Sequence, residues 1–144
     1  MMAASGARWM AVAVLAALLA GCGPRGPEFG QVSGVVRIKG KPTSRIAVRF
    51  LPDPDKGNDL AIVATGASGD DGGYALQYVD RGAEGAGAPV GWPRVTLDDM
   101  RLSGLAQGAP IPPQIIPPQY NSPSSTPLLV EVKSGDNTID LEVP

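Results

Sequence analysis

Short stretches of alternating apolar and polar residues dominate the chain after residue 31, and glycine or proline separates almost all of them. In the first stretch Val32, Gly34, Val36 and Ile38 share one face. An alternation of period two is typical of β-strands that bury one face. Because the chain contains 19 glycines and 15 prolines, any helix would be short. We therefore expect an all-β fold of short strands joined by many turns.

About seven strands are expected from this alternation. In chain order they cover 31–38, 46–51, 60–65, 74–78, 90–97, 129–132 and 137–143. The first two are predicted to pair as antiparallel strands joined by a turn, and the last two to pair across a turn at 133–136. Residues 80–88 are predicted as a loop. Seven strands over residues 31–144 predict a two-sheet Greek-key sandwich, immunoglobulin-like or transthyretin-like.

Seven prolines crowd into the segment between residues 110 and 127. Polyproline II is the natural conformation for such a run. Two interpretations stay open: a stiff surface connection, or a segment that docks into a partner's groove. Upstream, residues 100–105 have some helical spacing, but Gly104 and Gly108 limit any helix to a turn or two.

The N-terminal residues have the features of a secretory signal. Arg8 is the only charged side chain before residue 22, and residues 9–20 form an unbroken run of apolar and small residues. As a helix this run would rise about 18 Å, well short of a hydrocarbon core of about 30 Å. We expect a signal peptide over residues 1–21, a Gly/Pro tether over 22–30 and one β-domain over 31–144.

The segment Leu19-Ala20-Gly21-Cys22 resembles the lipobox of bacterial lipoproteins. The resemblance implies that a signal peptidase recognises Leu19, Ala20 and Gly21, cuts before Cys22, and leaves the Cys22 sulfur joined to a diacylglycerol. Two or three acyl chains give durable anchoring. The chain would then be held in the bacterial cell envelope, on the inner or the outer membrane.

Further motifs resemble the carboxypeptidase regulatory-like, or transthyretin-like, β-sandwich. They are Val32-Ser33-Gly34-Val35-Val36, Gly40-Lys41-Pro42, Val48-Arg49-Phe50 and Gly69-Asp70-Asp71-Gly72-Gly73-Tyr74-Ala75-Leu76. The mature chain as a whole also resembles small bacterial lipoproteins that contain this domain. The resemblance implies a β-sandwich and brings no catalytic residue to this chain.

Missing residue types exclude several kinds of chemistry. The chain has no histidine and Cys22 is its only cysteine, which removes the Ser-His-Asp and Cys-His arrangements and the usual zinc sites. Carboxylate chemistry alone would need two acids about 5–10 Å apart in a cleft. Without Arg8 the chain keeps 11 basic against 14 acidic residues, a net charge of −3, which argues against nucleic-acid binding.

Aspartates gather in two loops that could hold a cation. Asp53, Asp55 and Asp59 lie in one, and Asp70 and Asp71 in the other. Calcium takes six to eight oxygens, and neither loop has EF-hand spacing. Aspartate also forms turns with its own backbone, so we expect turn residues and no metal site.

Trp92 and Tyr120 are the remaining candidates for ligand contact. Trp92 could anchor the core beside Val95 or offer a platform for sugars, and Tyr120 could contact a ligand or pin the proline-rich segment to the sandwich. We expect a non-enzymatic binding or structural module without a cofactor, whose partner is an envelope protein or polysaccharide. The alternative is a calcium-assisted or carbohydrate-binding adhesion domain that uses Asp53, Asp55, Asp59 or Trp92.

Overall fold

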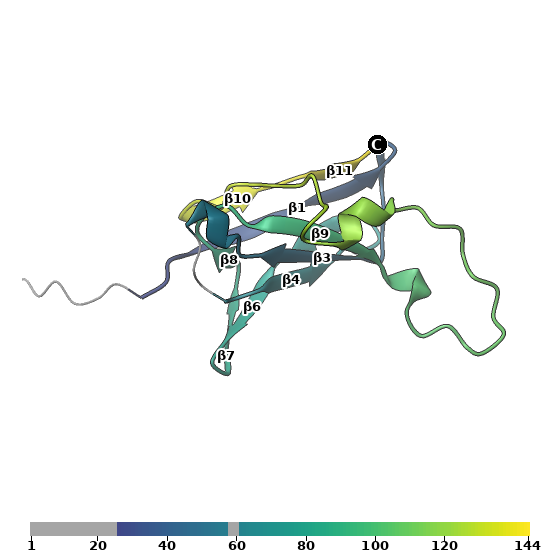
Figure 1. The fold of residues 1–144 in the computed structure, drawn as a ribbon, viewed down its shortest axis with the longest axis horizontal. Helices are drawn as coiled ribbons and strands as arrows, with labels where there is room; N and C mark the ends of the chain where they lie inside the picture. Colours follow the sequence, from purple (N-terminus) through teal and green to yellow (C-terminus); the bar gives the residue numbers. More distant parts are fainter. Residues whose placement is uncertain (1–25, 58–60) are drawn as a thin grey trace, which may run out of the picture.

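The computed structural model describes residues 26–57 and 61–144, and these form a β-sandwich of two packed sheets (Figure 1). One sheet is built on β1 (Phe29–Ile38), with β2 (Lys41–Pro42), β5 (Gly73–Ala75), β8 (Ala88–Pro89), β10 (Gly135–Thr138) and β11 (Leu141–Val143). The other contains β3 (Ile46–Leu51), β4 (Ala64–Ala67), β6 (Gln77–Asp80), β7 (Ala83–Ala86) and β9 (Arg94–Asp99). The predicted β-sandwich is confirmed, with eleven short strands among the described residues instead of seven.

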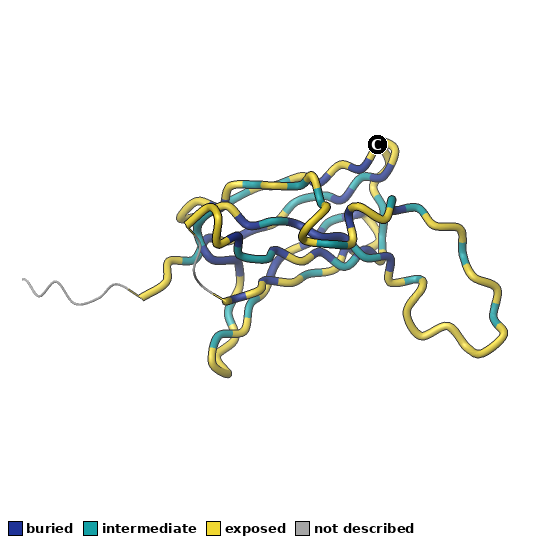
Figure 2. The backbone as a smooth tube through the Cα atoms, viewed as in Figure 1, coloured by how far each residue is buried: buried dark blue, intermediate teal, exposed yellow. Residues whose placement is uncertain are grey.

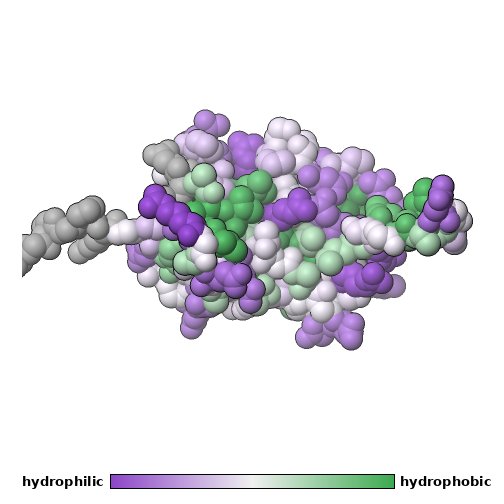
Figure 3. All heavy atoms as spheres, turned by 90° about the horizontal axis from the view of Figure 1, so that it is seen from below, coloured by the Kyte–Doolittle hydropathy of each residue, from purple (hydrophilic) through white to green (hydrophobic). Residues whose placement is uncertain are grey.

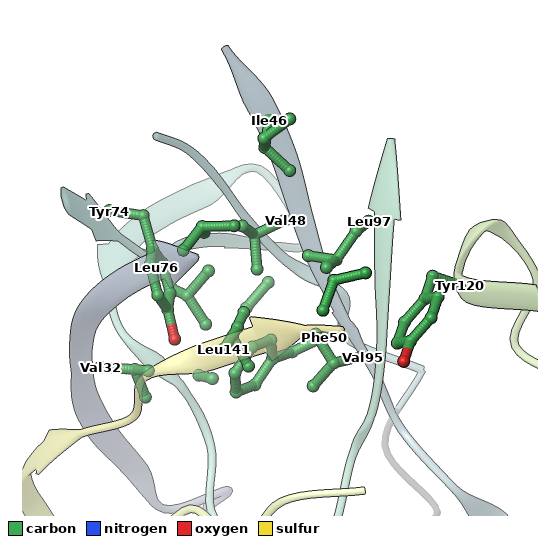
Figure 4. Packing of buried hydrophobic residues seen from close by; sticks show 14 of the residues in the cluster. Val32, Ile46, Val48, Phe50, Tyr74, Leu76, Val95, Leu97, Tyr120 and Leu141 are labelled. Carbon is green, nitrogen blue, oxygen red and sulfur yellow. The ribbon is translucent and has the colours of Figure 1, made fainter. Parts of the chain in front are cut away.

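The core lies between the sheets and collects one face of each strand. Val36, Val48, Phe50 and Leu97 are at most 1% exposed, and they meet in the cluster drawn in Figure 4. The period-two alternation placed these side chains inward because successive strand residues point to opposite faces. The predicted inward faces of β1 and β3 are therefore confirmed.

The first two strands do not form the predicted hairpin. β3 lies in the second sheet, where it pairs antiparallel with β4 and β9, while β1 pairs antiparallel with β2, β5 and β8. The chain crosses between the sheets at residues 43–45, where Arg45 has a φ of 60°. This crossing lets both strands bury their apolar faces against each other.

The C-terminal strands also pair differently from the prediction. β10 and β11 run parallel to β1, with Gly30 opposite Gly135 and Val36 opposite Leu141, so the register is the same for both. Residues 129–132 instead approach the start of β9, through bridges from Leu129 to Arg94 and from Val132 to Gly91. The predicted pairing of residues 129–132 with residues 137–143 is therefore wrong.

A glycine in β1 allows the parallel strands to approach. A Cβ atom on Gly34 would overlap the carbonyl oxygen of Ile139, which lies between β10 and β11. The Tyr74 hydroxyl donates a hydrogen bond of 2.6 Å to that same oxygen. Asp140 then accepts from the Val35 amide at 3.0 Å. Gly34 thus has a steric role in the Val-x-Gly-x-Val pattern.

Several strands differ from the sequence prediction: the expected strand 74–78 is divided between β5 and β6, which lie in different sheets, and the expected strand 90–97 is β9 at Arg94–Asp99. β1 begins at Phe29, within the expected 22–30 tether, and the Phe29 ring stacks on Tyr78 with the centroids 3.9 Å apart. The predicted loop at 80–88 contains β7, which pairs with β6. The third strand is β4, shifted from 60–65 to Ala64–Ala67.

The helices of the described residues are three short 3-10 turns, η1 (Pro54–Lys56), η2 (Met100–Leu102) and η3 (Pro118–Asn121). None of them has the length and apolar character that crossing a membrane requires. Residues 100–117, which we call the distal loop, project beyond the sandwich at the end opposite to Gly26 (Figure 1). Figure 2 shows that most of this loop is exposed.

Candidate functional site

Several predicted site residues fall outside the described part of the chain. Leu19, Ala20, Gly21, Cys22 and Asp59 belong to residues 1–25 and 58–60. The lipidation site and its recognition sequence therefore stay predictions.

Asp53 and Asp55 lie at the start of η1, where Asp53 caps the turn. One Asp53 oxygen accepts from the Asp55 amide at 3.1 Å, and the other accepts from Arg94 Nε at 2.8 Å. The Arg94 hydrogen bond holds the pKa of the Asp53 carboxyl below its ordinary value. Both oxygens of this 3% exposed residue are thus occupied, and the described residues hold no group of three potential metal ligands.

The second aspartate loop closes the turn that precedes β5. The Gly72 amide donates to the Gly69 carbonyl at 2.8 Å, and Asp71 Oδ1 accepts from the Gly73 amide at 2.9 Å. This hydrogen bond across two residues is the Asx-turn that aspartate favours. The predicted turn at 69–73 is confirmed.

Trp92 is not the core anchor that the sequence predicted. Trp92 is 42% exposed, and Leu129 on the bridged segment is 40% exposed. Pro93, Val95 and Leu97 point inward, and period-two alternation sends residue 92 to the opposite face. Trp92 and Leu129 therefore present apolar surface at the start of β9.

Tyr120 lies inside, and its neighbour Asn121 reaches the surface. The Tyr120 ring is 5% exposed and joins the core from η3 (Figure 4). Asn121 Nδ2 donates to the Leu97 carbonyl at 2.7 Å and to Asp98 Oδ1 at 3.1 Å. η3 is thereby fixed to β9, next to the foot of the distal loop.

A hollow of about 310 Å³ lies between β3, β9 and the distal loop, and we call it the distal hollow. Its lining residues are Arg49, Asp98, Asp99, Leu102, Ser103, Gln114, Ile116 and Asn121. They come from three separate parts of the chain, and this is the polar cluster that the sequence analysis missed. Only Asn121, beside Tyr120, carried a signal in the sequence.

Asp98 faces the distal hollow with one oxygen that accepts no hydrogen bond from the described residues. That oxygen, Oδ2, is buried and lies 3.3 Å from Arg49 Nη1, without hydrogen-bond geometry. Asp98 Oδ1 already accepts from Asn121. Oδ2 is therefore held by charge attraction to Arg49, without a hydrogen bond from the described residues.

Asp99 points to the other side of the strand and forms the base of the distal loop. Arg101 binds it with three side-chain hydrogen bonds, from Nε to Oδ1 at 2.9 Å and to Oδ2 at 3.1 Å and from Nη2 to Oδ2 at 2.6 Å. These bonds hold the pKa of Asp99 below its ordinary value and raise the pKa of Arg101. Asp99 is thus a fixed anion that positions the loop.

The arrangement of charged groups suits binding. Asp98 and Asp99 each lie next to an arginine, and the Arg101 hydrogen bonds lower the pKa of Asp99. Asn121 donates to the Leu97 carbonyl and to Asp98, so these groups hold one another in a fixed polar frame. The chain matches no known family model, no curated protein and no solved structure.

Proposed function

We propose that this protein is a lipid-anchored, non-enzymatic lipoprotein of the bacterial cell envelope, and that its sandwich is a binding or structural module. The observation that carries the proposal is Leu19-Ala20-Gly21-Cys22 at the end of a short apolar run. Cys22 stands seven residues before Phe29, a reach of about 25 Å at most. An anchor at Cys22 would keep the sandwich close to a membrane surface.

The residue types present support binding over catalysis. A chain without histidine lacks the commonest general base, and the carboxylates of the distal hollow lie beside arginines. The distal hollow instead combines charged and amide groups that are fixed by contacts with one another. Such groups hold a ligand in one orientation.

Lipid labelling tests the anchor. Cells that express the full chain are grown with an alkyne-bearing fatty acid, and the label and the mass of the protein are measured. We expect the wild type and a Gly23→Ser control to be labelled and cut, and Cys22→Ser to be unlabelled and uncut. A Cys22→Ser protein that still takes up lipid, or is still cut at the same bond, would overturn the proposal.

A second candidate function is carbohydrate binding through Trp92, which the exposure of its indole favours. Aromatic faces on a protein surface offer sugars a flat apolar contact. Calcium-assisted binding has less support, since both Asp53 oxygens already accept hydrogen bonds, one from Arg94 and one from Asp55. Co-sedimentation with insoluble peptidoglycan tests the sugar form: Trp92→Ala should lose binding and Leu102→Ala should keep it. Equal binding by both variants would remove this candidate.

A further inference from the structure

Large apolar side chains stand exposed on the distal loop. Met100, Leu102 and Leu105 are 38–41% exposed and Ile111 is 79% exposed. Figure 3 shows hydrophobic residues gathered on the projection formed by this loop. Between residues 100 and 117 the only charged residue is Arg101, and Asp99 binds it. This end of the molecule is therefore an apolar, nearly uncharged projection.

The tip of the loop, residues 109–113, has a defined conformation. Its sequence is Ala-Pro-Ile-Pro-Pro, so every residue either is a proline or precedes one, Pro113 being followed by Gln114. Proline fixes φ near −65°, and the residue before proline is driven to extended backbone. Among the described residues no peptide bond is cis, and none of residues 109–113 has a positive φ. Proline geometry therefore favours polyproline II at the tip without help from a partner.

Contacts at the base hold this segment in place. Arg101 Nη2 donates to the Pro113 carbonyl at 3.2 Å while the same guanidinium binds Asp99. Ile116, 2% exposed, and Tyr120 fix the returning chain in the core. A partner would therefore meet a preorganised ligand and lose little conformational entropy on ordering it.

We propose that residues 109–113 dock into a groove of a partner protein that is lined with aromatic side chains and bears hydrogen-bond donors. Aromatic grooves bind polyproline II by packing on proline rings and donating to the backbone carbonyls. The carbonyls of Pro110, Ile111 and Pro112 accept no hydrogen bond from the described residues. The inference rests on the proposed function and names the surface through which the module binds.

A protein groove fits this loop better than a sugar or a lipid surface. No aromatic residue lies between positions 93 and 119, so the loop brings no ring to stack on a sugar. Irregular backbone with free carbonyls is not tolerated in hydrocarbon. Gly26, the first described residue, lies at the end opposite the loop (Figure 1), and the four-residue step from Gly26 back to Cys22 spans about 14 Å at most. An anchor at Cys22 would therefore leave the loop free to extend away from the membrane.

Site-specific photo-crosslinking of the full chain tests the proposal in the bacterium that makes it. The photoreactive residue p-benzoylphenylalanine replaces Ile111, or exposed Ser134 as a control at a different loop. We expect one discrete adduct with another protein from position 111 and none from position 134. Replacing Pro110, Pro112 and Pro113 together by alanine should reduce the adduct about tenfold or more. A urea midpoint equal to that of the wild type would show that this variant is folded.

Competition shows whether the conformation is what the partner recognises. A synthetic peptide of residues 106–116 should suppress the adduct in isolated envelopes, and its mirror-image D-peptide should not. An adduct of twice the chain mass, a lipid adduct, no adduct, or equal competition by both peptides would each overturn the inference. If position 111 gives no adduct while Cys22 is labelled normally, the docking proposal fails and the proposed anchor does not. The failure of one proposal can therefore be distinguished from the failure of the other.

Discussion

Glycine and large apolar residues occur both in the sandwich and in the distal loop, in opposite surroundings. Phe50 of β3 is 1% exposed, whereas Ile111 of the loop is 79% exposed. Gly34 of β1 has backbone atoms where a Cβ would be, whereas Gly104 has no atom within 4 Å and a φ of +74°. The same residue types thus serve packing in one region and a projecting surface in the other.

The difference shows how the molecule divides its tasks. In the sandwich the buried side chains pack against distant strands, and truncating one of them lowers the stability of the fold. In the distal loop proline and the Arg101–Asp99 pair fix the backbone, which leaves the apolar side chains free for other contacts. Substitutions made in matched pairs, one in each region, test this division.

The largest difference is expected between two truncations. Phe50→Ala should destabilise the protein by about 3–5 kcal/mol, because it removes a buried ring and leaves a cavity. Ile111→Ala should change stability by less than about 0.5 kcal/mol. Urea unfolding gives both values. A loss from Ile111→Ala as large as that from Phe50→Ala would mean that the loop is part of the core.

The two glycines give the next contrast. Gly34→Ala should cost about 3 kcal/mol, since the new methyl group overlaps the Ile139 carbonyl oxygen and backbone must move. Gly104→Ala meets open space and should cost only the strain of a positive φ, about 1–2 kcal/mol. Equal effects in urea unfolding would show that Ile139 moves away from β1 without penalty.

A smaller effect is expected from two tyrosine hydroxyls. Tyr74→Phe should cost about 1–2 kcal/mol because the Ile139 carbonyl loses its 2.6 Å hydrogen bond. Burial raises the pKa of Tyr74, so this hydroxyl stays a donor. The Tyr120 hydroxyl forms no hydrogen bond with the described residues, and Tyr120→Phe should cost less than about 0.5 kcal/mol. Thermal unfolding of both variants measures these losses of stability. A larger loss for Tyr120→Phe than for Tyr74→Phe would contradict the prediction.

Local patterns in the sequence predicted the parts of the fold that depend on neighbours along the chain. The buried faces of β1 and β3 follow from alternation, and the turn at 69–73 follows from its Asp and Gly residues. β7 was missed because Ala-Glu-Gly-Ala has no alternation to detect. The parallel pairing of residues 135–143 with β1 was missed because the local pattern of neither segment determines its register with a distant strand.

The candidate site was harder to predict for the same reason. Arg49, Asp98 and Asn121 are far apart in the sequence and meet only because β3 pairs with β9 and η3 packs beside it. The side chain of Trp92 was placed in the core because Gly91 and Pro93 give no clear signal of where the strand begins. Without the start of β9 at Arg94, alternation does not show which residues point inward. The polyproline II conformation predicted for residues 110–127 is wrong at 118–125, where η3 and a following turn interrupt the run.

The smallest effect is one of pH, and it compares the base of the loop with the sandwich. Asp99 binds Arg101 and Asp140 binds Arg37, and each hydrogen bond lowers the carboxyl pKa. An unfolded aspartate has a pKa of about 3.9, so acid protonates the unfolded chain first. The stability from both pairs should be complete above about pH 5 and be lost as pH falls below about 4 through the lowered values.

Asn variants separate the two contributions. Asp99→Asn and Asp140→Asn should each be less stable than the wild type at pH 7, and the gap should narrow as pH falls from 4 to 2, because the wild type then loses the same interaction. Urea midpoints at pH 7, 4 and 3 measure the gap. The gap should be larger for Asp99, whose side chain is 4% exposed, than for Asp140 at 48%, because solvent screens the exposed pair. A gap that is constant with pH would mean that the carboxylates act through packing and that their charge contributes nothing.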